Sequence, residues 1–388
     1  MTVASTMTET SVRRLSRSER IRRDDRGRLD LKCLTLDELA SWVQRELGGD
    51  AALARRIYKQ LWQRGARTFS EMNDVARAWH EQLEQKAYVS MLTPDVVLAS
   101  EDGTRKYLWA LEDGHRIESV LIPDGDRITL CMSSQVGCAM ACQFCLTGDI
   151  GLKRHLKPSE IANQALQIGL QLQQETGERI TNIVMMGMGE PLHNLPNLVP
   201  ALTICLDDHA MNFSHRRVTV STVGLVEKMM ELAAALPVNL AVSVNATTEA
   251  QRLEIMPITR KHSLAELVEA MERFPLPPGK RITVEYVMMA GFNDSMDDAE
   301  RLMGLVERFP VKVNLIPYNE NPDRDIRRPD DAHVKAFQHY LVSRGVSCSI
   351  RTTRGIDISA ACGQLGKARQ QAKEQGWLHD ARVVAGLE

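Results

Sequence analysis

The chain has 388 residues, of which 44% are hydrophobic and 25% are charged, as in an ordinary soluble globular protein. This composition excludes a fibre or a wholly disordered chain, and no apolar run reaches the roughly eighteen residues of a membrane span. Because the arginine-rich start lacks the apolar segment of a secretion signal, we expect a cytoplasmic protein that does not bind membranes. In that reducing compartment, clustered cysteines more often bind metal or act in catalysis than form structural disulfides.

The formal charge of -2 is distributed unevenly along the chain. Residues 1–67 hold fifteen Lys or Arg against nine Asp or Glu, which is +6 and leaves -8 for the remainder. A basic segment on an acidic body fits an arm that binds nucleic acid, although a solvated tail is the commoner meaning of such a charge run. Residues 1–30 show no apolar period, and we expect them to be a disordered basic tail.

Residues 31–92 are expected to form a small helical accessory domain. In LTLDELASWVQREL, Thr35 and Glu38 have the spacing of a capping box, and apolar residues follow at helical spacing. The stretches AALARRIYKQLWQRG and EMNDVARAWHEQLEQ predict two further helices. The basic residues of the second helix could contact phosphates, but a solvated helix face explains them equally well.

The remaining chain changes to β-rich patterns. Residues 93–127 contain the turn sequences EDGH and DGD and are expected to form an extension between the helical domain and the core. In residues 128–365, helical stretches alternate with seven strand candidates: ITLCMSS, ITNIVMMG, RVTVSTVG, NLAVSVNA, ITVEYVMM, VKVNLIPYN and SCSIRTT. This alternation predicts an α/β fold, an open or closed β/α barrel with functional groups at the carboxyl ends of its parallel strands. Residues 366–388 are expected to form a helical tail.

Four of the eight cysteines lie in CMSSQVGCAMACQFC, which begins at Cys131. Cys138, Cys142 and Cys145 have the spacing C-x3-C-x2-C on a loop after the first strand, so that three thiolates can converge on one inorganic centre. Structural zinc takes four ligands, whereas a four-iron cluster held by three cysteines keeps one iron open for a small molecule. A zinc loop with its fourth ligand elsewhere, for example His155, stays open as the alternative.

Polar residues also follow the later strands. In MMGMGEP, the two glycines allow close approach of the backbone to a ligand, and Glu190 could accept a hydrogen bond from an ammonium group. Many turns of this kind, however, need glycine only for their geometry. Ser221 in TVSTVG, and Ser243 with Asn245 in AVSVNA, could bind the same ligand or could cap the helices that follow.

In order and spacing, CAMACQFC, MMGMGEP, RRVTVST, NLIPYN and TTRGIDISAACGQL resemble the motifs of the radical S-adenosylmethionine (SAM) adenosine methyltransferases. This family modifies large-subunit ribosomal RNA and, for some members, tRNA, and the resemblance extends from about Thr35 to Leu365. It implies a partial (β/α)6 radical-SAM barrel over residues 128–365 and an RNA-binding role for the helical accessory domain of residues 31–92. The implied partners are 23S rRNA, tRNA as in some members of the family, and an electron donor such as a flavodoxin- or ferredoxin-type reductant. The enzyme is expected to be a monomer.

The resemblance also implies the site residues, position by position. Cys138, Cys142 and Cys145 match the ligands of a [4Fe-4S] cluster, whose open iron binds SAM, and two SAM molecules are used in each turnover. The catalytic matches are Cys362, which is first methylated on sulfur, Cys131, which resolves a later covalent intermediate, and Glu118, which is assigned as proton acceptor. The positions that match SAM contacts are Gly189, Glu190, Ser221, Ser243, Val244, Asn245 and Asn319.

The chemistry of adenine explains why two further thiols are needed. Carbon 2 is electron-poor and carries no acidic hydrogen, so it cannot attack an electrophilic methyl group. A 5'-deoxyadenosyl radical can instead take hydrogen from a methyl group on Cys362, and the resulting carbon radical adds to the ring. The protein stays bonded to RNA until a base removes the ring proton and the Cys131 thiolate attacks the Cys362 sulfur, which leaves a disulfide to be reduced.

The expected function is therefore methylation of adenosine carbon 2 in 23S rRNA, and in tRNA. Methylation of carbon 8 would use the same thiols and stays an alternative. A non-catalytic, metal-stabilised RNA-binding protein is a second alternative, but it would not need Cys131 or Cys362. The chain departs from the family where Ser243, Val244 and Asn245 replace a common Ser-Leu-His, and at Leu146, where a small or hydroxyl residue is common. These departures bear on substrate choice.

Overall fold

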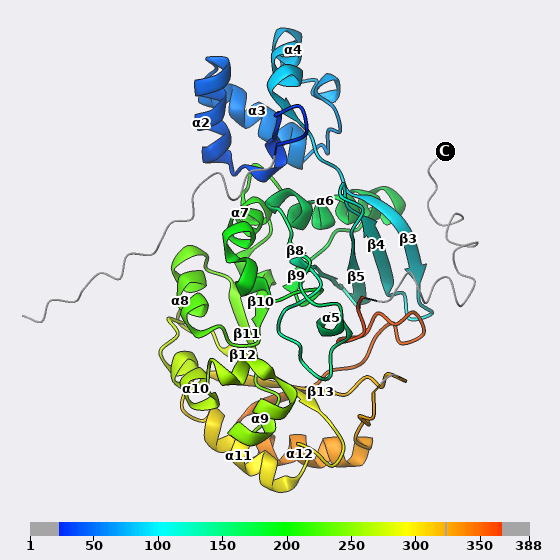
Figure 1. Cartoon of the computed structure of the whole chain (residues 1–388), viewed down its shortest axis with the longest axis vertical. Helices are drawn as coiled ribbons and strands as arrows, with labels where there is room; N and C mark the ends of the chain where they lie inside the picture. Colours follow the sequence, from blue (N-terminus) through cyan, green and yellow to red (C-terminus); the bar gives the residue numbers. More distant parts are fainter. Residues whose placement is uncertain (1–22, 323, 367–388) are drawn as a thin grey trace, which may run out of the picture.

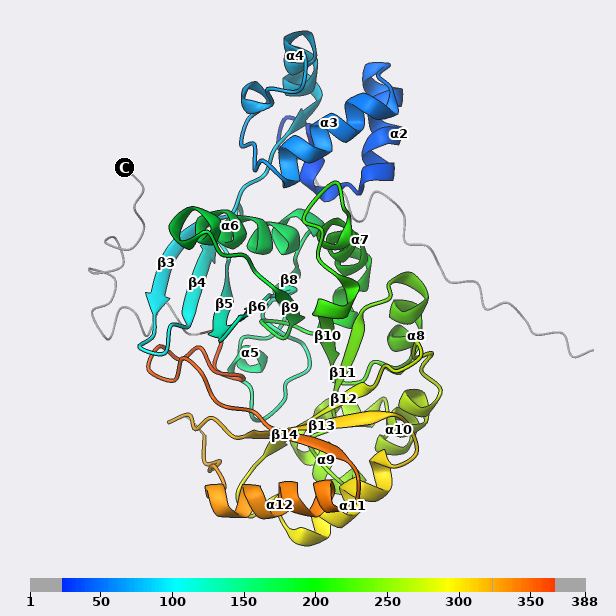
Figure 2. The same cartoon turned by 180° about the vertical axis from the view of Figure 1, so that it is seen from behind.

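The computed structural model describes residues 23–322 and 324–366, and Figures 1 and 2 show it from opposite sides. A small helical domain lies at one end of a larger α/β body. The predicted basic tail falls mostly outside the described residues, although residues 29–30 form strand β1. The predicted helical tail also lies outside them, apart from Gly366. In the described part of the chain, no helix has the length and apolarity that crossing a membrane requires.

The helical domain is built from capped amphipathic helices. Helix α2 (Leu36–Leu47) begins with the predicted capping box, in which the Glu38 N–H donates to Thr35 Oγ1 and the Thr35 N–H donates to Glu38 Oε2. Helices α3 (Ala51–Trp62) and α4 (Arg77–Lys86) complete the domain, and β1 (Leu29–Asp30) pairs in parallel with β2 (Ala87–Tyr88). The basic side chains of α3 and the following turn are exposed to solvent: Arg55, Arg56, Lys59, Arg64 and Arg67.

A ten-stranded sheet forms the body, and its parallel part confirms the seven predicted strands. These strands are β6 (Arg127–Cys131), β9 (Asn182–Met185), β10 (Val218–Thr222), β11 (Asn239–Ser243), β12 (Ile282–Met288), β13 (Val311–Pro317) and β14 (Ser347–Ile350). The antiparallel extension consists of β3 (Thr93–Ala99), β4 (Arg105–Ala110) and β5 (Arg116–Asp124). The sheet order β14-β13-β12-β11-β10-β9-β6-β5-β4-β3 leaves β14 and β3 as edges, so the barrel is not closed by strand pairing.

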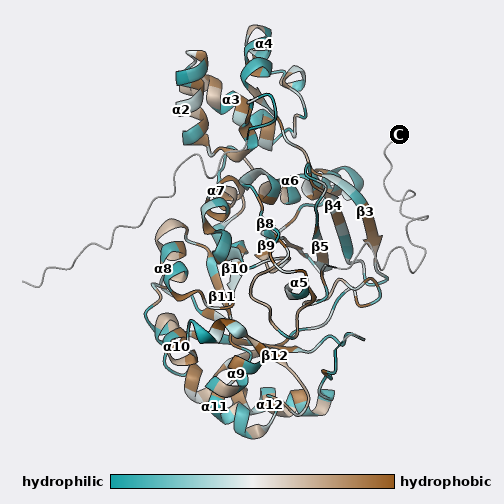
Figure 3. Cartoon of the chain, in the orientation of Figure 1, coloured by the Kyte–Doolittle hydropathy of each residue, from teal (hydrophilic) through white to brown (hydrophobic). Residues whose placement is uncertain are grey.

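Helices cover the outside of the curved sheet (Figures 1 and 2). They are α6 (Pro158–Thr176), α7 (Leu195–Leu206), α8 (Val226–Ala235), α9 (Glu249–Ile255), α10 (Leu264–Glu272), α11 (Met296–Val306) and α12 (Asp331–Ser343). A short helix, α5 (Leu146–Asp149), and a small hairpin of β7 (Gln135–Val136) and β8 (Arg154–His155) lie in the loop after β6. Along these helices, hydrophilic and hydrophobic residues alternate (Figure 3).

The two faces of the parallel strands differ in polarity because successive side chains alternate between them. Outward-facing residues such as Leu130, Val220 and Val284 are fully buried against the helices. The inward-facing residues line the barrel lumen, a cavity of about 540 Å³, and many of them are polar: Thr129, Thr219, Thr283, Glu285, Asn314 and Ser349. The fold therefore encloses a polar chamber.

Candidate active site

Two adjoining cavities form the candidate site. The smaller, of about 160 Å³, lies at the carboxyl ends of the strands and is lined by all three clustered cysteines. The larger is the barrel lumen. Residues of the cysteine loop, the strand ends and the carboxyl-terminal loop line both cavities, and Cys362 is one of them. The site thus has two chambers with a thiol at their boundary.

The loop after β6 carries the three cysteines to the smaller cavity. All three cysteines precede α5, and Cys145 is the N-cap residue directly before this helix. Burial raises the pKa of the Cys138 thiol to about 12 and also raises the pKa of Cys142 and Cys145. Because the thiolate is the form that binds metal, a positively charged centre is needed to deprotonate these side chains.

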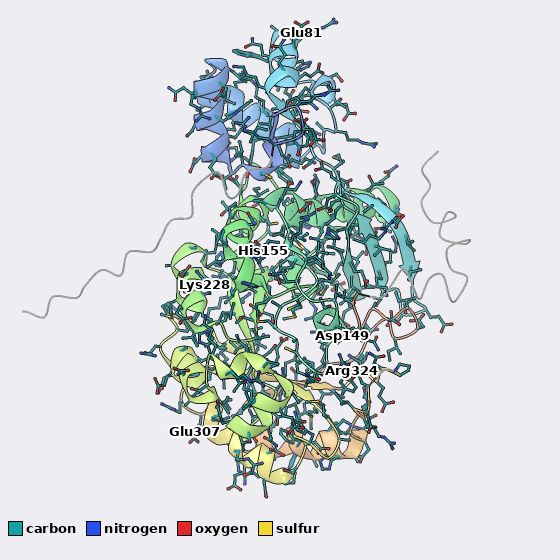
Figure 4. All side chains as sticks on the ribbon, in the orientation of Figure 1. Glu81, Asp149, His155, Lys228, Glu307 and Arg324 are labelled. Atoms are coloured by element: carbon teal, nitrogen blue, oxygen red, sulfur yellow. The ribbon has the colours of Figure 1, made fainter. Side chains whose placement is uncertain are left out.

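The positions of the ligand atoms bear on the zinc alternative. Zinc with four ligands at about 2.3 Å holds its sulfur atoms about 4 Å apart. In the described residues, no three ligand atoms from Cys138, Cys142, Cys145 and His155 lie within 4.8 Å of one another. His155, labelled in Figure 4, instead pairs its Nδ1 with Gln135 Nε2 at 2.9 Å and packs its ring edge-on against His193. In this structure these four residues are therefore not arranged around a single zinc ion.

Glu190 supplies a buried carboxylate beside the cysteines. Its Oε1 accepts from the Leu192 N–H at 3.1 Å, and its Oε2 accepts from the Val223 N–H at 2.9 Å. Burial outweighs these hydrogen bonds and raises the pKa of Glu190 to about 7. An ammonium group of a ligand in the smaller cavity would stabilise the ionised carboxylate. Glu190 therefore suits a ligand that carries an amino group.

The glycines before Glu190 are required by the protein's own packing. A Cβ on Gly187 would lie 2.7 Å from the Met132 carbonyl carbon, and one on Gly189 would lie 2.5 Å from Gln135 Cβ. Gly189 also has φ +101°, which disfavours any other residue. The MMGMGEP turn thus packs directly against the chain that leaves β6. This close packing fixes Glu190 at the edge of the cavity.

The predicted SAM contacts fall into two groups. Gly189, Glu190, Ser221, Ser243 and Asn319 line the smaller cavity, whereas Val244 and Asn245 do not line either cavity. The Val244 N–H donates to the Glu285 carbonyl at 3.0 Å. Buried Asn245 has φ +58°, and its Oδ1 accepts from the Val287 N–H at 2.8 Å. These two residues join β11 to β12.

A loop from β14 brings Cys362 onto the cysteine loop. The Leu146 N–H donates to the Gly363 carbonyl at 2.8 Å, and Thr147 Oγ1 donates to the Leu365 carbonyl at 2.8 Å. Asn319 Nδ2 donates to the Cys362 carbonyl at 3.0 Å. On its other side, α5 is tied to the segment after β13 by the ion pair of Asp149 with Arg324, both labelled in Figure 4. These contacts hold Cys362 between the chambers.

Cys131, the last residue of β6, lines only the larger cavity. It pairs with Val120 and Val184 on the neighbouring strands and is buried. Burial raises the pKa of its thiol to about 12; the nearby Cys362 adds to this increase, and Arg351 opposes it. Cys131 and Cys362 are both free thiols. Although 231 positions separate them in the sequence, both line the larger cavity.

Glu118 lies on β5 beneath the Cys362 loop and lines neither cavity. Its Oε1 accepts from the Gly366 N–H at 2.9 Å, and its Oε2 lies 3.8 Å from Lys106 Nζ. Lys106 Nζ in turn donates to the Ser359 carbonyl at 3.0 Å. In this conformation the buried Lys106–Glu118 pair fastens both ends of the loop that carries Cys362.

Two charged groups in the lumen, Glu285 and Arg351, were not among the predicted site residues. Glu285 is buried, lines both cavities, and accepts at Oε2 from Ser221 Oγ at 2.8 Å and Ser243 Oγ at 3.5 Å. Arg351 follows β14 and lines the larger cavity. A carboxylate in the middle of the apolar strand ITVEYVMM is a signal that could have revealed Glu285, because a buried charge requires a partner or a function.

Comparison with known proteins gives consistent matches. Residues 132–305 match the family described as the radical SAM superfamily. The chain is 49% identical over 348 residues to the dual-specificity RNA methyltransferase RlmN of Geobacter sulfurreducens, covering 90% of this chain and 95% of that protein. It is 50% identical over 347 residues to the protein of the same name from Pelobacter propionicus, covering 89% and 98%.

A solved structure agrees with these matches. The crystal structure of a radical SAM methyltransferase from Sphaerobacter thermophilus superimposes with a TM-score of 0.81 and 38% identity. The alignment covers 87% of this chain and 98% of that one. Because the barrel of residues 128–365 makes up less than this share of the chain, the similarity extends beyond the barrel.

Proposed function

The chain belongs to the RlmN family of RNA methyltransferases within the radical SAM superfamily, and on this basis we propose that it methylates carbon 2 of an adenosine in 23S rRNA and in tRNA. The structural observation that carries the proposal is the position of Cys362, which lines both cavities. A sulfur atom at this boundary can receive a methyl group from one chamber and deliver a one-carbon unit into the other.

The smaller cavity fits the cofactors. Cys138, Cys142 and Cys145 would hold a [4Fe-4S] cluster, and Glu190 would bind the amino group of SAM, with Ser221, Ser243 and Asn319 around the rest of the molecule. When bound, these groups supply the methyl group and the 5'-deoxyadenosyl radical. The contacts assigned to Val244 and Asn245 stay predictions from the resemblance.

The two thiols divide the later steps. Cys362 takes the methyl group on sulfur and presents it to the lumen, where the adenosine is bound. Cys131 then attacks the Cys362 sulfur, which frees the methylated base from the protein and joins the two cysteines in a disulfide. Glu118 matches the family's proton acceptor, and its hydrogen bond to the Gly366 N–H supports a role in positioning the Cys362 loop.

The same resemblance supports three further proposals. The electron donor is a flavodoxin- or ferredoxin-type reductant, since one electron is needed to start each radical step. The exposed basic face of α3 helps to bind RNA through its phosphates. The enzyme acts as a monomer in the cytoplasm, where its RNA substrates lie.

Nucleoside analysis tests the proposal directly. Ribosomal RNA and tRNA from cells with and without the gene are digested and compared by mass spectrometry with standards methylated at carbon 2 and carbon 8. We expect 2-methyladenosine in both RNAs, lost on deletion and restored by the wild-type gene but not by Cys362→Ala. The 8-methyl product would identify the alternative activity, and no change in either RNA would refute the proposal.

A further inference from the structure

The larger cavity poses a problem of proton transfer for Cys131. This thiol is buried, and with a pKa of about 12 it is protonated at neutral pH. The neutral thiol is a poor nucleophile, because the thiolate is the form that attacks sulfur. The resolving step of the proposed function therefore requires a group in the same cavity that accepts the Cys131 proton.

Two carboxylates of the described residues line this cavity, Asp124 and Glu285. Asp124 lies at the exposed end of β5, where it pairs with Arg127 and, at 3.1 Å, with Arg354. The hydrogen bond from Arg127 lowers the pKa of Asp124, which makes it a weaker base. Asp124 is thus committed to an ion-pair cluster at the mouth of the lumen.

Glu285 is buried, whereas Asp124 is exposed, and one carboxylate oxygen of Glu285 accepts no hydrogen bond from the described residues. Both serine hydrogen bonds go to Oε2, and within the described part of the chain Oε1 accepts no hydrogen bond. Its place on β12, level with Ser243 on one side and Asn314 on the other, puts the carboxylate on the wall shared by the two cavities. Glu285 therefore has an oxygen available for a proton.

Arg351 provides a positive charge for the same group of side chains. Negative charge on Cys362 raises the guanidinium pKa of Arg351 most, and negative charge on Glu285 and Cys131 adds to this, so Arg351 lies within electrostatic reach of all three. A cation in this position stabilises a thiolate against the cost of burial. The titratable and charged side chains that line the larger cavity are Asp124, Arg127, Cys131, Cys145, Glu285, Lys312, Arg351, Arg354 and Cys362.

We propose that Glu285 accepts the proton of Cys131 when the Cys131 sulfur attacks Cys362, and that Arg351 stabilises the transient thiolate. The Cys131 S–H bond breaks, and its electron pair forms the disulfide bond with the Cys362 sulfur. The bond between that sulfur and the carbon attached to the RNA base breaks, and its electron pair stays on carbon. That carbon becomes a methyl group by taking the proton from Glu285. Atoms and electrons balance, and a dithiol reductant later opens the disulfide.

The test rests on the proposed function and uses the cluster-loaded enzyme with SAM, reductant and RNA. In Glu285→Gln we expect methylation of Cys362, followed by peptide mass, at the wild-type rate. We expect product release to fall by roughly 100-fold or more, with a nuclease-sensitive protein–RNA adduct on denaturing gels. Release in this variant should increase with pH, since hydroxide can replace the lost carboxylate. Asp124→Asn, which changes the other carboxylate of the cavity, should accumulate no adduct.

A second assay measures the same displacement without SAM or RNA. In a cluster-loaded Cys348→Ser background, Ellman's reagent forms a mixed disulfide with Cys362 and releases a first equivalent of thionitrobenzoate. Cys131 then attacks the Cys362 sulfur of this mixed disulfide, which forms the Cys131–Cys362 disulfide and releases a second equivalent. Because Cys33 and Cys205 are fully buried, the second burst of yellow thionitrobenzoate reports closure of the Cys131–Cys362 disulfide. Glu285→Gln should slow this burst, Glu285→Asp should largely retain it, and Cys131→Ala should abolish it.

The outcomes separate this inference from the proposed function. Release of product by Glu285→Gln at the wild-type rate would overturn the role of Glu285. Loss of Cys362 methylation in the same variant would also overturn it, because the carboxylate would then act in cofactor binding. If Cys131→Ala accumulates no adduct although the wild type methylates RNA, the resolving role of Cys131 in the proposed function is refuted. In the second assay, a burst in Glu285→Gln as fast as in the wild type would independently refute proton transfer to Glu285.

Discussion

The Lys106–Glu118 pair is predicted to keep the Cys362 loop closed. Both side chains are almost completely buried, with 1% and 2% of their surfaces exposed, and each also binds a backbone group of the loop. In Lys106→Met the Glu118 carboxylate stays buried without its cation, which typically costs about 3–5 kcal/mol. Because the Gly366 N–H still binds Glu118, we expect the lower value, about 3 kcal/mol.

If opening the loop relieves that cost, the open population increases by roughly 100-fold, since about 1.4 kcal/mol corresponds to a factor of ten. The assay is the rate at which iodoacetamide alkylates Cys362 at neutral pH, followed by peptide mass spectrometry. We expect this rate to increase in Lys106→Met by up to that factor. The double variant Lys106→Met with Glu118→Gln removes both charges, so no unpaired charge stays buried. In this variant the alkylation rate of Cys362 should return most of the way to the wild-type rate.

Arg105→Met is the matched control. It changes the neighbouring residue of the same strand, whose ion pair with Glu175 is partly exposed and contributes less than about 1 kcal/mol. The reasoning would be wrong if Lys106→Met left Cys362 as protected as it is in the wild type. It would also be wrong if Arg105→Met exposed Cys362 to the same extent.

Three further predictions follow from single side chains. Cys131→Ala should trap a protein–RNA adduct, seen as a nuclease-sensitive shifted band on a denaturing gel, and normal product release without that band would contradict its resolving role. Asn319→Ala, which removes the hydrogen bond to the Cys362 carbonyl, should speed alkylation of Cys362 and leave the iron content unchanged; equal alkylation would contradict the tether. Burial lowers the pKa of Lys32 from 10.5 to about 8. Between these two pH values the unfolded state binds more protons than the folded state. The free energy of unfolding should therefore increase with pH in that range, by up to about 3 kcal/mol. Urea unfolding of Lys32→Met should lack this increase, and an identical pH slope in both proteins would refute it.

Much of the fold could be predicted from local patterns. The capping box of Thr35 and Glu38 and the apolar period after it defined α2, because both depend on residues within one or two helical turns. The alternation of strand candidates with helical stretches gave all seven parallel strands. The order of the strands in the sheet came from the tertiary structure, because right-handed crossovers are compatible with more than one strand order.

The candidate site was predicted only in part. Spacing alone brought Cys138, Cys142 and Cys145 together, because they lie on one loop. The pairing of Cys131 with Cys362 came from the resemblance, since 231 positions separate them in the chain. Asn245 illustrates the opposite case: a polar residue at a strand end matched a ligand contact, yet its amide joins two strands.

Sequence by itself thus determined the elements and the cysteine loop, because these depend on neighbouring residues and on backbone chemistry. Only the tertiary structure decided that Lys106 and Glu118 fasten the Cys362 loop, and that Glu285 and Arg351 share a chamber with both thiols. The physical reason is that the curvature of the sheet decides which charged side chains are buried in the same cavity. Their burial, and hence their electrostatic behaviour, is a property of the assembled barrel.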